Sequence, residues 1–94
     1  VAPAELEALL VTHPAVLDAA VVRRADEEAG EVPKAFVVLK PGFDGDAAMV
    51  KTLQDFVKQS IAPYKYPRAM EFLPSLPRTE TGKLQRFRLR QRSH

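Results

Sequence analysis

Eight prolines divide this 94-residue chain into short segments and limit the length of any helix or strand that it can form. A proline lacks a backbone N–H and disfavours helix at the residue before it. Pro14, Pro41, Pro63 and Pro74 each follow a patterned apolar segment and are expected to end it, whereas Pro3 suits a first helical position. No stretch approaches the roughly 20 apolar residues of a membrane helix. We therefore expect one small domain built from short elements.

Hydrophobic periodicity predicts three helices and three strands. Valine-rich runs at 16–22 and 34–40 predict two strands that pair antiparallel through a polar loop, 23–32. Asp46 is the expected N-cap of the second helix. The expected fold is α+β, a small three-stranded, mainly antiparallel sheet covered by helices. The other predicted elements are helices at 1–13, from Asp46 to before Pro63 and at 84–91, and a strand at 69–73.

The residue types present exclude several kinds of site. There is no cysteine, which excludes disulfides, cysteine-bound zinc and thiol catalysis. The two histidines, His13 and His94, leave almost no material for a histidine-rich metal site or a Ser-His-Asp triad. His13 directly precedes Pro14 and is interpreted as a helix-end residue. We predict no metal site, and with no signal peptide visible the expected compartment is reducing and cytoplasmic.

The charge is divided unevenly along the chain. Residues 1–50 carry four Lys/Arg and nine Asp/Glu, a net charge of −5, whereas residues 51–94 carry ten Lys/Arg and three Asp/Glu, a net charge of +7. The basic half favours an anionic partner or a solvated surface, and it leaves open a docking surface for an acidic protein. A nucleic-acid-binding module is a further alternative, suggested by Tyr64, Tyr66, Phe72 and Phe87. The acidic first half and the lack of a recognised binding motif argue against it, so we expect neither a nucleic-acid nor a membrane partner.

The loop Pro77-Arg-Thr-Glu-Thr-Gly-Lys83 is the most informative segment. Gly82 permits a tight turn, and Lys83 at the tip of that turn is presented outward. The ammonium group of a lysine can neutralise a carboxylate or a phosphate. The loop is not a Walker A loop, because Pro77 stands where that motif needs a glycine. From these residues alone, a surface turn lysine is the favoured interpretation.

Three segments together carry a family resemblance. The segment Val1-Ala-Pro-Ala-Glu-Leu-Glu7 is similar to the end of a hinge motif, Pro63-Tyr-Lys-Tyr-Pro-Arg68 to a Tyr-Lys-x-Pro motif, and Leu76 to Arg86 to a final Leu-Pro-Lys/Arg-Thr-x-Ser/Thr-Gly-Lys-x-x-Arg motif. In this order and spacing they resemble the C-terminal domain of the adenylate-forming enzymes, which include acyl- and aryl-CoA ligases, luciferases and peptide-synthetase adenylation domains. The sequences of these segments are most similar to those of benzoate- and hydroxybenzoate-CoA ligases.

The resemblance implies that residues 1–94 form the mobile C-terminal lid domain of a larger enzyme. An N-terminal domain that binds ATP and the acyl group, and a hinge, would precede Val1. The full-length enzyme would use ATP, Mg²⁺ and CoA to make an acyl-adenylate and then an acyl-CoA thioester. The lid alone would bind none of these and would be inactive. A related alternative is an adenylation domain that loads a carrier protein.

The resemblance also assigns roles to individual residues. Lys83 matches the family's catalytic lysine, and Gly82 and Thr81 would shape its loop, with Thr81 standing where many relatives have serine. Acetylation of Lys83 would remove its charge, which implies an acetyltransferase and a deacetylase as possible partners.

A second set of residues would contact CoA. Tyr64 and Tyr66 would stack on the adenine ring, and Arg68 would pair with a phosphate. The alternative is that the tyrosines pack beneath their loop. The last predicted helix carries four arginines, and most of them are expected to be solvated, while some could face the large domain or CoA phosphates. These arginines are Arg86, Arg88, Arg90 and Arg92.

Overall fold

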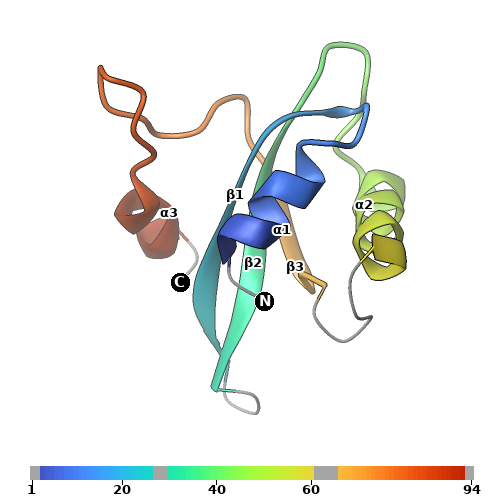
Figure 1. Ribbon diagram of the computed structural model, residues 1–94, viewed down its shortest axis with the longest axis horizontal. Helices are drawn as coiled ribbons and strands as arrows, with labels where there is room; N and C mark the ends of the chain where they lie inside the picture. The colour runs from blue at the N-terminus through green and yellow to red at the C-terminus, as the bar shows by residue number, and fades with distance from the viewer. Residues whose placement is uncertain (1–2, 27–29, 61–65, 93–94) are drawn as a thin grey trace.

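The computed structural model describes residues 3–26, 30–60 and 66–92. Three helices and three strands follow one another along these residues, as Figure 1 shows. Their bounds are α1 (Pro3–Leu10), β1 (Val16–Asp26), β2 (Gly30–Leu39), α2 (Ala47–Ser60), β3 (Ala69–Phe72) and α3 (Arg86–Arg92). The predicted order of elements is confirmed. None of the described helices is long and apolar enough to span a bilayer.

The strands form one mixed sheet in the order β1-β2-β3. β1 and β2 pair antiparallel from Val16 opposite Leu39 to Asp26 opposite Gly30, which confirms the predicted hairpin. β3 pairs parallel with β2 over four residues, from Lys34 opposite Ala69. The parallel pairing follows from the connection, because the chain returns through α2 and therefore enters β3 in the same direction as β2.

The predicted polar loop at 23–32 is wrong over most of its length. β1 continues to Asp26 and β2 begins at Gly30, so the two strands stay in register well beyond the valine-rich runs. Arg23, Arg24 and Glu31 are exposed in this extension. The hairpin here extends past the core, and the backbone ladder continues the pairing as far as Asp26 opposite Gly30.

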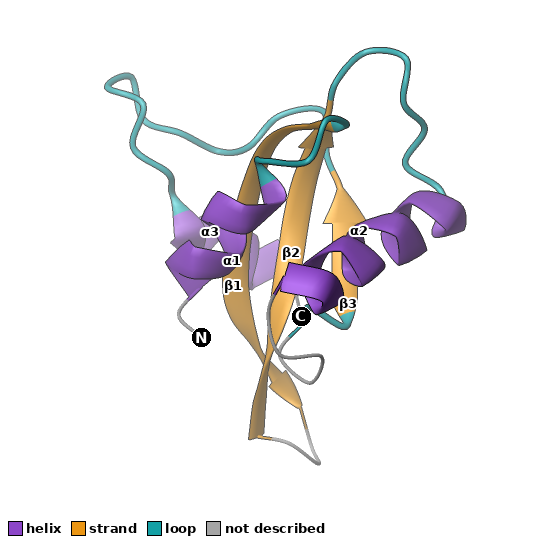
Figure 2. Cartoon of the chain, turned by 45° about the vertical axis from the view of Figure 1, so that its right-hand side comes forward, coloured by secondary structure: helices purple, strands orange, loops and turns teal. Residues whose placement is uncertain are grey.

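Helices cover both faces of the sheet. Leu6 and Leu10 of α1 and Leu53 and Val57 of α2 pack on one face, together with Val21 and its same-face neighbours on β1 and β2. Figure 2 shows these two helices side by side in front of the strands. Leu89 of α3 packs on the opposite face, in a second core with the residues that alternate with the first set. The second core contains Ala20, Val22, Phe36, Val38, Leu76 and Leu89.

Local signals at the helix ends agree with the sequence analysis. Asp46 caps α2, since its Oδ1 accepts a hydrogen bond from the Met49 backbone N–H at 2.9 Å. α1 starts at Pro3 but ends at Leu10, three residues before the predicted end. His13 has the expected structural role: its Nδ1 accepts a hydrogen bond from the Ala15 N–H at 3.1 Å, and its ring contacts the ring of Phe56 edge-on.

The last turn of α3 is fastened to β3 by an ion pair. Arg92 donates to the carboxylate of Glu71, and Lys34 on β2 donates to the same carboxylate at 3.2 Å. Burial of the carboxyl raises its pKa, but the hydrogen bonds from Arg92 and Lys34 outweigh this effect and hold the pKa of Glu71 below its usual value. The ion pair therefore makes the fold sensitive to acid.

We expect the free energy of unfolding of this chain to fall as the pH drops below 4.5, the ordinary pKa of such a carboxyl. A group whose pKa is lowered by folding stabilises the fold above its unfolded-state pKa, and this contribution is lost as it takes up a proton. Glu71→Gln should lower the free energy of unfolding at neutral pH by about 0.2–1 kcal/mol. It should also make the decrease of that free energy at acid pH less steep. Urea unfolding monitored by circular dichroism across pH measures both effects. The exposed control is Glu80→Gln. If the free energy of unfolding decreases equally at acid pH in Glu71→Gln and in this control, the expectation is contradicted.

Candidate functional site

The segment between β3 and α3 forms a small hairpin on the α3 side of the sheet. Arg78 and Leu84 form an isolated antiparallel bridge at its base, and the Gln85 N–H donates to the Pro77 carbonyl at 2.9 Å. Leu76 is buried before the hairpin, and Leu84 packs against the same second core. The apolar residues thus fix the base of the hairpin, while its tip, residues 80–83, stays exposed.

The tip is a three-residue loop closed by backbone hydrogen bonds. The Gly82 N–H donates to the Thr79 carbonyl at 2.9 Å, and the Thr79 N–H donates to the Lys83 carbonyl at 2.9 Å. Gly82 has a φ of +88°, the left-handed conformation that this loop type needs after its turn. A Cβ on Gly82 would meet nothing within 4 Å, so the backbone conformation and not the available space requires glycine.

Two hydroxyl groups add to this loop. Thr79 Oγ1 accepts a hydrogen bond from the Lys83 N–H at 3.1 Å, and it lies 3.0 Å from Thr81 Oγ1. The hydroxyl groups therefore tie the residues on both sides of Gly82 together. The role of Thr81 in shaping the loop stays a prediction, and this contact is the one that Thr81 makes through its hydroxyl group.

Lys83 projects from the tip of the hairpin. Its side chain is exposed, and no carboxylate of the described residues lies within salt-bridge distance of its ammonium group. A shallow pocket of about 290 Å³ lies beside it, and Phe87, which is half exposed, forms part of the wall. An ammonium group placed in this way is available to a negatively charged group brought to it from outside the domain.

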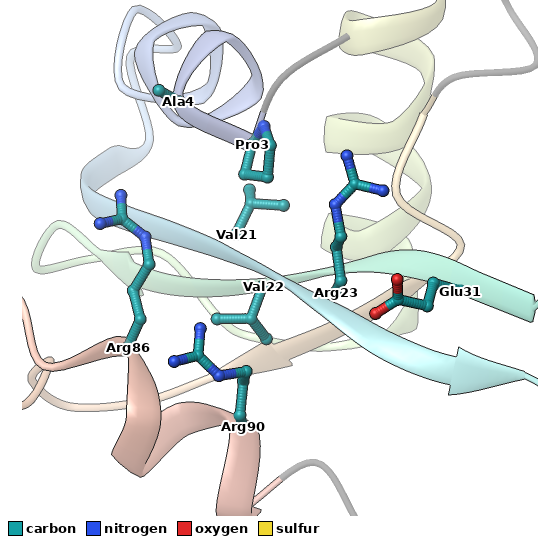
Figure 3. Close-up of a pocket in the computed structure, with 8 residues that line it drawn as sticks. All are labelled: Pro3, Ala4, Val21, Val22, Arg23, Glu31, Arg86 and Arg90. Carbon is teal, nitrogen blue, oxygen red and sulfur yellow. The ribbon is translucent and has the colours of Figure 1, made fainter.

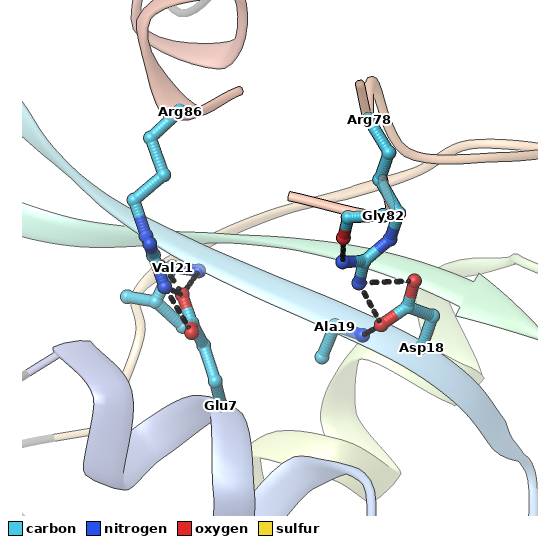
Figure 4. A network of polar contacts seen from close by, with 7 residues as sticks. All are labelled: Glu7, Asp18, Ala19, Val21, Arg78, Gly82 and Arg86. Atoms are coloured by element: carbon cyan, nitrogen blue, oxygen red, sulfur yellow. Dashed lines mark hydrogen bonds and ion pairs between the residues drawn. The ribbon is translucent and has the colours of Figure 1, made fainter. Parts of the chain in front are cut away.

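Arg78 fixes the hairpin to the sheet, a role that the sequence analysis missed. Its Nη1 donates to the Gly82 carbonyl at 2.8 Å, and its Nη2 donates to both carboxylate oxygens of Asp18 on β1, at 3.0 and 2.9 Å. Figure 4 shows this guanidinium between the loop and the strand. The only signal in the sequence was the position of Arg78 within the final motif, because its partner lies 60 residues away.

Arg86 forms a second bridge to the first part of the chain, so it is not one of the arginines of α3 that are only solvated. Its guanidinium donates to both carboxylate oxygens of Glu7 on α1, with Nε and Nη2 at 3.2 and 2.8 Å from Oε2. The same carboxylate accepts the Val21 N–H of β1 at 2.8 Å, as Figure 4 shows. Glu7 thereby occupies a backbone donor on the outer side of an edge strand and holds the start of α3 there.

A larger open pocket of about 450 Å³ lies between α1, β1 and α3. Figure 3 shows Arg86 and Arg90 entering it from α3 and Arg23 and Glu31 from the hairpin strands. Three guanidinium groups and one carboxylate give it a basic lining, although Glu7 already engages Arg86. Lys83 does not line this pocket, but Arg86 and Arg90 line both it and the shallow pocket beside Lys83.

Of the predicted CoA-binding residues, Tyr66 lies on the other side of the sheet. Tyr64 is outside the described residues. Tyr66 is half-buried against the core of α1 and α2, and the Lys58 ammonium lies 4.1 Å from the centre of its ring. Arg68 is exposed, and the carbonyls of Pro67 and Arg68 accept hydrogen bonds from Gln54 Nε2 at 3.2 and 3.4 Å. Tyr66 therefore packs as the structural alternative expects, while Arg68 is open to a ligand.

The described residues show no cluster of three or more His, Asp or Glu side chains that could hold a metal ion. Three cations lie at the predicted sites: Lys83 at the hairpin tip, the exposed Arg68, and Lys58 over the ring of Tyr66.

Comparisons with known proteins give consistent results. A benzoate–CoA ligase from Thauera aromatica is 53% identical over 90 residues, which cover 96% of this chain and 17% of that enzyme. A crystal structure of a Brucella canis acyl-CoA synthetase superposes with a TM-score of 0.93 at 43% identity and covers 97% of this chain and 17% of that one. An anthranilate CoA ligase in complex with anthranoyl-AMP superposes with a TM-score of 0.89 at 42% identity, over 99% of this chain and 18% of that one.

The chain thus spans about a sixth of the length of the relatives it matches, and in each case it matches almost from end to end. Residues 5–83 match a single domain family. This match, which ends on Lys83, and the superpositions show that the chain belongs to the family of AMP-binding enzyme C-terminal domains.

Proposed function

We propose that this chain is the C-terminal domain of an ATP-dependent, AMP-forming carboxylate–CoA ligase that acts on an aromatic acid. The observation that carries the proposal is the exposed Lys83 at the tip of a fixed hairpin, with no carboxylate of the described part of the chain within salt-bridge distance of its ammonium group. The aromatic substrate class rests on the relatives, since two of the similar proteins are a benzoate–CoA ligase and an anthranilate CoA ligase. Free CoA is favoured over a carrier protein as acceptor for the same reason.

The reaction has two halves. A carboxylate oxygen of the acid attacks the α-phosphorus of ATP, pyrophosphate leaves and an acyl-adenylate forms. The sulfur of CoA then attacks the acyl carbon, the thiol proton is released and AMP leaves. The large domain would hold ATP, its Mg²⁺ and the acid, and the domain described above would bring its own groups to them.

In the first half-reaction Lys83 would lie against the acid carboxylate and the nucleotide oxygens. Its role is to position the carboxylate and to offset negative charge, and it forms no covalent bond. A unit charge at about 4 Å contributes roughly 4 kcal/mol at an effective dielectric constant near 20. If this is felt mainly in the transition state, it corresponds to about three decades of rate.

The second half-reaction would use the opposite side of the domain. The hairpin packs with the core beneath α3, whereas Tyr66 packs with the core beneath α1 and α2, so the sheet separates the two candidate sites. One site cannot replace the other at an active centre unless the whole domain turns. This separation supports the proposal that the domain rotates between the half-reactions and presents Arg68 to a CoA phosphate after Lys83 has withdrawn.

We expect Lys83→Ala in the full-length enzyme to slow acyl-adenylate formation by about two decades or more, because the charge beside the reacting carboxylate is lost. Formation of the thioester from preformed acyl-adenylate should change far less. Single-turnover assays of each half-reaction measure the two effects. Lys51→Ala, which removes an exposed lysine on α2, is the matched control. An equal loss in both half-reactions would contradict the assignment of Lys83 to adenylation.

A double substitution of Tyr64 and Arg68 by alanine should raise the KM for CoA and leave ATP–pyrophosphate exchange unchanged. The physical reason is that an arginine pairs with a phosphate and an aromatic ring stacks on adenine. Steady-state assays with varied CoA and an isotope-exchange assay test this. An unchanged dependence on CoA would remove these residues from the proposed CoA surface.

Lys83 is also proposed as a site of acetylation by a lysine acetyltransferase, reversed by a deacetylase. The side chain is exposed at a loop tip, and acetylation would remove the charge on which adenylation depends. We expect treatment of the full-length enzyme with an acetyltransferase and acetyl-CoA to acetylate Lys83 and to suppress adenylation in proportion. Mass spectrometry that finds Lys83 unmodified after such treatment would rule out this regulation by the enzyme tested.

A further inference from the structure

The hairpin that carries Lys83 needs a connection to the rest of the domain if it is to place an ammonium group accurately. Beyond the apolar base, the contacts near its tip are those within the loop itself and those made by Arg78. The guanidinium of Arg78 is the group that joins the tip to a strand, since it contacts both the Gly82 carbonyl and the carboxylate of Asp18.

The contact with Gly82 acts on the backbone of Lys83. The Gly82 carbonyl belongs to the peptide group that links Gly82 to Lys83, and Arg78 Nη1 donates to it at 2.8 Å. Because the peptide group is planar, holding its oxygen also holds the direction of the Lys83 N–H. That N–H in turn donates to Thr79 Oγ1 at 3.1 Å. Two hydrogen bonds therefore fix the orientation of this peptide group, one accepted by the Gly82 carbonyl and one donated by the Lys83 N–H.

The other end of the connection is a carboxylate that is itself held in place. Asp18 lies at the start of β1, where the pairing with β2 shifts register between Val16 and Asp18. Its Oδ1 accepts a hydrogen bond from the Ala19 N–H at 2.9 Å, and both of its oxygens accept from Arg78 Nη2. The irregular start of the strand thus presents a fixed acceptor toward the hairpin.

We propose that Arg78, held by Asp18, is a positioning residue for adenylation that acts through Lys83. The inference rests on the proposed function, since it concerns how the ammonium group of Lys83 is held in position. A guanidinium is suited to this task because its planar fork directs two donors to two acceptors at a fixed angle, whereas a lysine at the same position has one nitrogen. A displacement of about 1 Å of a reacting group is sufficient to slow a reaction about 100-fold.

A merely stabilising ion pair would behave differently. The side chains of Arg78 and Asp18 are 39% and 31% exposed, and pairs of this exposure contribute little to the stability of a fold. Removal of the pair should therefore leave the unfolding temperature nearly unchanged. If removal of the pair greatly slows one half-reaction and leaves the unfolding temperature unchanged, the pair acts by positioning Lys83.

The test uses the full-length enzyme with ATP and benzoate, and compares Arg78→Ala, Asp18→Asn and Lys83→Ala. Arg78→Ala and Asp18→Asn should each lower the maximal adenylation rate about 10–100-fold, with the KM for ATP and benzoate changed by less than about threefold. Thioester formation from preformed benzoyl-adenylate should stay within about threefold. Arg78→Lys should recover part of the adenylation rate, and Arg88→Ala, which removes an exposed arginine from α3, serves as the control.

A double variant shows whether Arg78 acts through Lys83. In the Lys83→Ala background, Arg78→Ala should have no further effect on adenylation, because there is no ammonium group left to position. If Lys83→Ala alone leaves adenylation intact, the proposed function fails and the inference fails with it. If Lys83→Ala abolishes adenylation but Arg78→Ala equals the control, slows both half-reactions equally or is additive with Lys83→Ala, the positioning role is overturned while the proposed function stands.

Discussion

The arrangement of the last third of this domain depends on arginine–carboxylate pairs that reach across the sheet. Arg86 binds Glu7 at the outer side of β1, and Arg92 binds Glu71 on β3, so α3 is fastened at both ends to opposite edges of the sheet. Between these ends Leu89 lies in the second core. A helix of seven residues is too short to be stable alone, and these contacts are what hold it in place.

The same pairs explain the uneven charge of the chain. The acidic first half and the basic second half meet inside the domain, since Glu7 and Asp18 accept from Arg86 and Arg78. Part of the basic charge that suggested an external anion is therefore used internally. The cations that remain for a ligand include the ammonium of Lys83 at the hairpin tip, Arg23 and Arg90 in the open pocket, and Lys58 beside Tyr66.

Much of this architecture could be predicted from local features of the sequence. The prolines, the valine-rich runs and the Asp46 cap identify the elements, because helix ends and strand cores depend on near neighbours. The extension of the hairpin to Asp26 and Gly30 was missed, since its charged residues suggest a loop and the backbone pairing that defines it leaves no signal in the sequence. Register of this kind leaves no hydrophobic pattern outside the core.

The candidate site was predictable where it depends on local signals and not where it depends on contacts between distant residues. Lys83 was identified by its motif and by the glycine before it, both local signals. The bridges from Arg78 to Asp18 and from Arg86 to Glu7 join residues 60 and 79 positions apart. Neither partner could be chosen among the nine acids of the first half from the sequence alone, because the choice depends on where the folded strand places them.

The central claim is that a positive charge at position 83 drives adenylation, and chemical rescue tests it most directly. The domain contains no cysteine, so Lys83→Cys introduces a unique thiol within it. Alkylation of that thiol with 2-bromoethylamine restores an ammonium group on a chain of nearly the same length, whereas iodoacetamide adds a neutral amide. We predict that the amine restores most of the adenylation rate of the full-length enzyme and that the amide does not. Equal rescue by both reagents, or by neither, would contradict the account.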